Sequence, residues 1–205
     1  MEEFLCPDPG IRLFLCRYDA DGLPDLKLSG AIDVPAGITH PERIRQHQIS
    51  RQMGKAILSA GLMFRDTGKP YSPGLAGVSI SHTRGIVCLL TSAHSDCGVD
   101  IETVSEKALR IRSKFMNTEE KELTERLFSA EQSATLLWSF KEACYKLHGL
   151  GGLDFKKSIK LQEIDIYKKK LRGQLLLENS EMIWISGFFR FFEGRVWVYV
   201  IPEKS

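Results

Sequence analysis

The chain has 205 residues, of which 43% are hydrophobic and 26% charged, a composition typical of a globular protein with a buried core rather than of a disordered one. Its formal net charge of +2 is too small to indicate a nucleic-acid-binding protein, and no apolar run approaches the roughly 18 residues that a membrane span needs. The five cysteines form no C-x-x-C pair, so neither a disulfide framework nor a zinc knuckle is predicted, and a reducing cytoplasmic location is expected.

The first half is predicted to combine one long helix with several strands. A strand is expected at residues 11–18. The helix is expected to begin at Thr39, where Glu42 three residues later completes a capping box, and to close at Gly61. Three short strands, separated by turn residues, are expected after it, at 78–81, 86–91 and 98–102. The first half should therefore end near residue 103.

The second half is predicted to begin with helical material from Thr118. Ser129 and Gln132 form a second capping box before a long helix that Gly149 ends. Four strands rich in β-branched and aromatic residues follow, at 159–166, 171–177, 182–191 and 195–201. We therefore predict an α+β fold of two similar lobes, 1–103 and 104–205, each a small and mostly antiparallel sheet packed on a long helix. The candidate active site would lie at their junction.

Two carboxylates stand two residues apart in the predicted strand 98–102. Period-2 alternation sends Val99 and Ile101 to one face, while Asp100 and Glu102 project together from the other. Because adjacent like charges repel, the pair must be either solvated or neutralised by a cation. Oxygen-only ligands suit Mg²⁺ or Mn²⁺. A solvated strand face remains the alternative for this segment taken alone.

The long helix of the second half stacks Trp138, Glu142 and Lys146 in one i, i+4 row. A Glu–Lys pair at this spacing is common and need only stabilise the helix. Glu142 could also supply a third oxygen ligand to a metal, with Lys141 or Lys146 meeting a bridging phosphate. Such an arrangement suits phosphoryl-type transfer, in which catalysis consists largely of positioning and charge neutralisation.

A polar turn follows the strand at 78–81, where hydroxyls, backbone N–H groups and His82 could converge on an anion. A single turn histidine is more often structural, so the segment alone does not decide. The chain has no G-x-x-x-x-G-K-[ST] loop and no G-x-G-x-x-G pattern, which argues against a P-loop or a Rossmann nucleotide site.

Taken in order, four segments resemble the signature of the 4′-phosphopantetheinyl transferases. They are Gly68-Lys69-Pro70, Ser79-Ile80-Ser81-His82-Thr83, Gly98-Val99-Asp100-Ile101-Glu102 and Trp138-Ser139-Phe140-Lys141-Glu142-Ala143-x-x-Lys146. The resemblance covers roughly residues 65 to 155. The chain length resembles the two-lobed, monomeric Sfp-type branch rather than the short trimeric synthases.

The resemblance implies transfer of 4′-phosphopantetheine from coenzyme A to a serine of an apo acyl or peptidyl carrier protein, with release of adenosine 3′,5′-bisphosphate. It implies that Asp100, Glu102 and Glu142 hold Mg²⁺, that Glu142 is a candidate base, and that Lys146 contacts the diphosphate. By position, Lys69 and Pro70 correspond to the nucleotide-binding element, and Ser81 and His82 to residues that hold the 3′-phosphate. Arg51 is the nearest match to an arginine that faces the nucleotide, although its register differs by a residue.

Two other functions stay open at the level of sequence. A metal-dependent nuclease or phosphodiesterase could use the Asp-x-Glu pair, but the lysine that often follows two residues later is Val104 here. A non-enzymatic binding module could use the basic segment 156–172, which holds seven of the 28 Lys and Arg residues, together with the aromatic residues at 188–192. The favoured interpretation expects no nucleic-acid or membrane partner and a monomeric protein.

Overall fold

The computed structural model describes residues 1–19, 34–177 and 179–203. The elements of the first half are β1 (Glu2–Leu5), β2 (Ile11–Arg17), α1 (Pro41–Ile57), β3 (Met63–Phe64), β4 (Pro70–Tyr71), β5 (Gly77–Thr83), β6 (Ile86–Ser92) and β7 (Gly98–Thr103). Those of the second half are α2 (Glu106–Ile111), a 3-10 turn (Arg112–Lys114), α3 (Thr118–Glu125), α4 (Ala130–His148), β8 (Ile159–Asp165), β9 (Lys170–Leu176), β10 (Met182–Phe192) and β11 (Arg195–Pro202).

Helix α4 has the two ends that the sequence predicts. Ser129 is the N-cap and accepts a hydrogen bond from the backbone of Gln132, whose side chain accepts in return from the backbone N–H of Ser129. Gly149 closes the helix in the left-handed conformation, with φ of 72°, which glycine adopts without a Cβ penalty. These local signals place the helix that carries Glu142 and Lys146.

Helix α1 begins later and ends earlier than predicted. Its N-cap is His40, which makes no side-chain capping bond, and Pro41 opens the helix because its fixed φ suits the first turn and its missing N–H needs no partner there. Glu42 therefore completes no capping box with Thr39, and instead accepts a hydrogen bond from the Tyr18 hydroxyl at 2.6 Å. The helix stops at Ile57, and Gly61 lies in the turn that follows.

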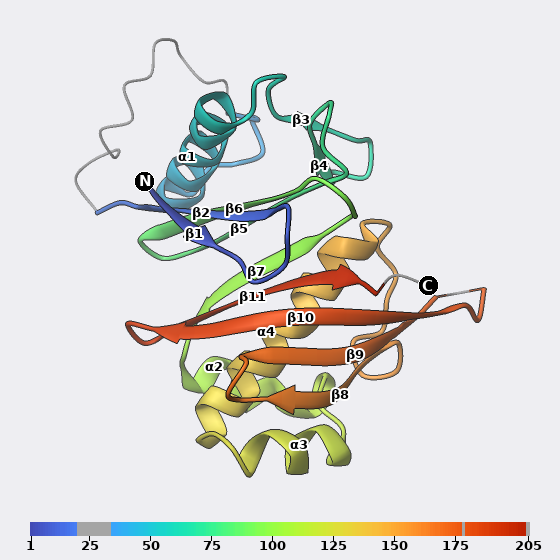
Figure 1. The fold of residues 1–205 in the computed structure, drawn as a ribbon. Coiled ribbons are helices and arrows are strands. Elements are labelled where there is room, and N and C mark those ends of the chain that lie inside the picture. Colours follow the sequence, from blue (N-terminus) through green and yellow to red (C-terminus); the bar gives the residue numbers. More distant parts are fainter. Residues whose placement is uncertain (20–33, 178, 204–205) are drawn as a thin grey trace.

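Nine of the described strands form two antiparallel sheets that pack face to face between helices, while β3 and β4 pair with each other in a separate two-stranded sheet. The first sheet has the order β1-β2-β6-β5 and the second the order β7-β11-β10-β9-β8. One face of the first sheet packs on α1, with Ile49 and Met53 in its core, and its other face packs on the second sheet, with Leu13 and Tyr199 in the shared core. Helix α4 covers the outer face of the second sheet (Figure 1). The α+β fold is confirmed, as a stack of helix, sheet, sheet and helix.

The boundary between the first and the second sheet lies before β7, one strand earlier than the predicted division at residue 103. β7 hydrogen-bonds to β11 in the second sheet, with Asp100 opposite Val198 and Glu102 opposite Val196. The first sheet therefore ends at β6, and β7 joins the second sheet although it lies within the predicted first half, 1–103. The reason is tertiary, because the strand pattern of residues 98–103 does not say which neighbour will pair with it.

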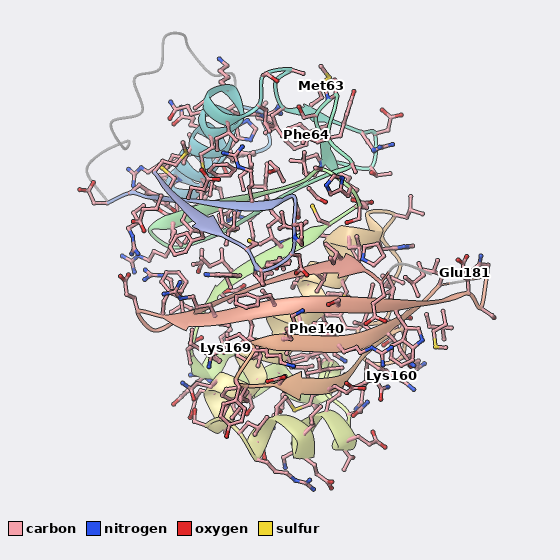
Figure 2. The ribbon with its side chains drawn as sticks, viewed as in Figure 1. Met63, Phe64, Phe140, Lys160, Lys169 and Glu181 are labelled. Atoms are coloured by element: carbon pink, nitrogen blue, oxygen red, sulfur yellow. The ribbon has the colours of Figure 1, made fainter. Side chains whose placement is uncertain are left out.

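The aromatic residues at 188–192 fill the interior of this stack. Phe188 packs on Trp197 and Tyr199 between the sheets, and Phe189 is fully buried under α4. Figure 2 shows Phe140 of α4 behind the second sheet. The aromatic surface on which a binding-module interpretation depended is thus largely core. Among the described residues, no helix combines the length and apolar character required to cross a bilayer.

Candidate functional site

A cavity of about 300 Å³ opens where β5 and β7 meet α2 and α4. It is lined by Ile80, Ser81, His82, Asp100, Glu102, Thr103, Ser105, Lys107, Ala108, Ile111, Thr135, Trp138, Glu142 and Lys146. Residues from both predicted halves of the chain, 1–103 and 104–205, contribute to this wall. The cavity brings together the carboxylates and the lysine that the sequence singled out.

Alternation along β7 and the helical repeat of α4 together build the polar part of the cavity. Val99 and Ile101 are fully buried between the two sheets, so Asp100 and Glu102 face the cavity from the same side of the strand. From α4, Trp138, Glu142 and Lys146 line it as one i, i+4 row. The carboxylate face of β7 and the i, i+4 row of α4 therefore line the same cavity.

The three carboxyl groups of the cavity repel one another. Burial and, after it, the negative charge of Asp100 raise the pKa of Glu102 to about 7, although the nearby Lys107 and Lys146 act in the opposite direction. The pKa of Glu142 is also raised, first by burial and then by Asp100. Asp100 itself is 4% exposed and accepts hydrogen bonds on Oδ1 from Ser81 and from Lys146, each at 2.7 Å. Two lysines, Lys107 and Lys146, thus line a cavity that holds three carboxyl groups.

The chemistry of these groups suits a hard divalent cation. No three acidic, histidine or cysteine side chains in the described ranges stand close enough to hold a metal as they are arranged. Asp100 Oδ2, however, is buried and has no hydrogen-bond partner within the described part of the chain. A cation with oxygen ligands would satisfy that atom and offset the repulsion that raises the pKa values of Glu102 and Glu142.

A larger cleft of about 720 Å³ adjoins this cavity and shares Ile80, His82 and Lys146 with it. Its remaining lining residues are Ile38, Arg43, His47, Ser50, Phe64, Thr67, Gly68, Lys69, Pro70, Ser79, Tyr145, Gly149, Leu150 and Gly151. The cationic side chains come from three elements or loops, and no carboxylate lines the cleft among the described residues. The charge of the cleft therefore suits an elongated anionic ligand.

One comparison with known proteins bears directly on this site. Residues 96–190 match the family model of the 4′-phosphopantetheinyl transferase superfamily. The match confirms the resemblance at the level of the superfamily. It contains Asp100, Glu102, Glu142 and Lys146, and it begins after the segments that carry Lys69 and His82. It supports phosphopantetheine transfer in general, an activity for which this superfamily uses coenzyme A, a divalent metal and carrier proteins. No curated protein matches the chain.

Three residues of α1 that line the cleft, Arg43, His47 and Ser50, were missed by the sequence analysis. Arg43 and His47 lie four residues apart and face the cleft, whereas Arg51, one further turn along, is absent from its lining. The Arg51 guanidinium instead stacks on the ring of Phe64 at 4.0 Å, and its partial burial lowers its pKa. Figure 2 shows Phe64 beside α1. The spacing 43, 47, 51 was the signal that could have found Arg43 and His47.

His82 lies at the boundary of the two cavities. It follows Ser81 on β5, is exposed, and lines both spaces. Its pKa lies below the usual value, first because surrounding protein atoms replace part of its water and then because the charge of Lys146 disfavours protonation. The imidazole thus stands where the two cavities meet.

Lys141 lies outside the site, contrary to the sequence-based assignment. Its side chain is fully buried, and its Nζ forms an ion pair with Glu120 at 2.8 Å. The same nitrogen donates to the carbonyls of Phe155 at 2.9 Å and Ile159 at 2.8 Å, so all three of its protons are used. The helix turns residue 141 away from the row of residues 138, 142 and 146. Of the two lysines that were expected to contact a phosphate, Lys146 therefore remains the candidate.

Lys69 lines the larger cleft but is held by the protein itself. Its Nζ pairs with Asp96 and also donates to the carbonyl of Leu147, at the C-terminal end of α4. The side chain is 11% exposed. Lys69 thus ties the loop before β4 to the end of α4. Its neighbour Pro70 begins β4 and contributes an apolar part of the same wall.

Proposed function

We propose that this protein transfers the 4′-phosphopantetheine group of coenzyme A to a serine of an apo acyl or peptidyl carrier protein, with Mg²⁺ and with Mn²⁺ as a possible substitute. The observation that supports the proposal is the connection between the carboxylate cavity and the larger cleft. A cavity with three carboxyl groups opens into a cationic cleft, and Lys146 and His82 stand at the connection. A diphosphate held there would lie between the metal ligands and the nucleotide-binding wall.

The residues divide into two binding functions. Asp100, Glu102 and Glu142 would hold the divalent ion, which supplies charge neutralisation on the diphosphate when bound. Lys146, already within 2.7 Å of Asp100, would contact the diphosphate from α4. His82, Lys69 and Pro70, together with Arg43 and His47 of α1, would accommodate the adenosine end. Arg51 would act on this wall through Phe64.

The chemical step follows from the position of Glu142. The serine hydroxyl of the carrier attacks the phosphorus that bears pantetheine, and the bond from this phosphorus to the bridging oxygen of the diphosphate breaks. Adenosine 3′,5′-bisphosphate leaves. Glu142 accepts the serine proton, directly or through one water, and its raised pKa makes it a more effective base near neutral pH. Lys146 stabilises the negative charge that develops on the leaving diphosphate oxygen.

The experiment is an incubation of the protein with coenzyme A, Mg²⁺ and a panel of apo carrier proteins, followed by mass measurement. Each accepted carrier should gain the mass of one phosphopantetheine group, and a carrier whose serine is replaced by alanine should gain none. Nuclease activity on DNA or RNA, measured in parallel with the same metal, should be absent. If every intact apo carrier stays unmodified, the proposed function is wrong.

A monomeric enzyme is part of the proposal. All of the proposed catalytic and metal-binding groups lie on β7 and α4 of a single chain. No second copy is needed to complete the cavity. Sedimentation of the protein at assay concentrations should therefore give the mass of one chain, and activity should be proportional to protein concentration.

A further inference from the structure

Two serines of β5 join the two large sheets at edges that no described backbone ladder connects. β5 is the edge strand of the first sheet and β7 the edge strand of the second, and no ladder pairs them among the described strands. Val99 and Ile101 of β7 are fully buried, so their outward N–H groups need partners other than water. The Ser79 hydroxyl accepts from Val99 N at 3.0 Å, and the Ser81 hydroxyl accepts from Ile101 N at 3.3 Å.

Ser81 has no hydrogen-bonding capacity left for a ligand. A hydroxyl has one proton to donate and two lone pairs to accept with. The proton of Ser81 goes to Asp100 Oδ1 at 2.7 Å, and its lone pairs accept from Ile101 N and from Lys146 Nζ, the latter at 2.7 Å. The residue is 5% exposed. A phosphate could bind this oxygen only by breaking one of these bonds.

The same contacts determine which oxygen of Asp100 is available. Ser81 and Lys146 both bind Oδ1, which leaves Oδ2 as the oxygen without a partner in the described structure. Rotation of the carboxyl group away from this orientation would break the two hydrogen bonds to Oδ1. Ser81 therefore orients Asp100 in the way that hydrogen-bonding neighbours orient metal-ligating carboxylates.

We propose that Ser81 is a positioning residue of this site and not a ligand of the coenzyme A 3′-phosphate, and that Ser79 and Ser81 together join β5 to β7. The proposal rests on the proposed function for the role of Asp100 as a metal ligand. The joining of the strands does not. His82, whose exposed side chain lines both cavities, remains the phosphate-binding member of the Ser-His pair.

Amide hydrogen exchange tests the joining of the strands without any assay of activity. Ser81→Ala should increase exchange at the Ile101 amide by about tenfold or more, because the amide loses its partner. The matched variant Ser79→Ala should do so at Val99, and it leaves the contacts of Asp100 and Lys146 intact. Ser81→Thr, which keeps the hydroxyl, should restore protection at Ile101. Unchanged exchange at Ile101 in Ser81→Ala would overturn the proposal.

Binding of two nucleotides tests the positioning role. In the presence of Mg²⁺, calorimetry should show that Ser81→Ala weakens the binding of coenzyme A and of 3′-dephospho-coenzyme A by the same factor, about 10–100-fold. Ser81→Thr should restore part of this affinity. A loss confined to coenzyme A would show that Ser81 binds the 3′-phosphate, and the proposal would fail. If the unmodified protein binds neither compound, the proposed function fails, and the exchange pattern still decides whether the serines join the strands.

Discussion

Gly98 controls how closely α4 approaches β7, and therefore the distance between the carboxylates of the two elements. A Cβ on Gly98 would lie 1.9 Å from the carbonyl oxygen of Ala143 and 2.9 Å from the backbone nitrogen of Leu147. Cβ contacts under 3.0 Å essentially do not occur, so Gly98→Ala must increase this separation by more than about 1 Å. β7 cannot move freely, because Gly98 pairs with Val200 of β11. The helix must therefore shift.

The shift of the helix should lower both the free energy of unfolding and the rate of transfer, and each loss is measured separately. Overpacking costs about 1–3 kcal/mol of unfolding free energy, measured by urea denaturation. A displacement of about 1 Å between Asp100 and Glu142 should lower the rate of Mg²⁺-dependent transfer by about 10²-fold. Mass measurement of the modified carrier over time gives that rate.

Two control variants separate these effects. Leu161→Ala removes a buried side chain of β8, the edge strand farthest from β7, and should cost about 2–5 kcal/mol with little change in rate at a temperature where the protein is folded. Gly37→Ala adds a Cβ with nothing within 4 Å and should change neither quantity. If Gly98→Ala loses stability but transfers at the normal rate, the site does not depend on this close approach.

Three further predictions concern the charged residues. Glu142→Gln should lower the transfer rate by at least about 10²-fold. The variant should unfold at the same or a higher urea concentration, because a buried repulsive charge is removed. A fall in both the transfer rate and the urea midpoint would indicate a structural role for Glu142. In metal-free buffer, Glu102→Gln should become more stable relative to the unmodified protein as pH rises from 4.5 to 7, by up to about 1.4 kcal/mol per pH unit, because the folded state retains a proton that the unfolded state has released. Urea midpoints that differ by a constant amount at every pH would refute this. Lys141→Ala should lower the free energy of unfolding by about 3–5 kcal/mol, because it leaves Glu120 charged and unpaired in the core. Lys146→Ala should instead abolish transfer with a much smaller loss of stability. If denaturation and mass assays show the reverse, Lys146 is the structural lysine and Lys141 the functional one.

The residues that local patterns place correctly are those on regular elements. Alternation put Asp100 and Glu102 on one face of β7, and the capping box and Gly149 gave the limits of the helix that carries Glu142 and Lys146. Each of these features depends on neighbours within about four residues, and backbone geometry alone determines them. The resemblance to the transferase signature could be read for the same reason, as a series of short segments.

The sequence by itself therefore determined the α+β class and the main candidate ligands, while tertiary structure decided which of these groups share a site. Pairing of β7 with β11, rather than with β5, moved the division between the sheets and left two serines to join the edges. Burial turned Lys141 toward Glu120, although it is next to Glu142 in sequence. Such choices depend on contacts between residues tens of positions apart, where packing and desolvation outweigh any local preference.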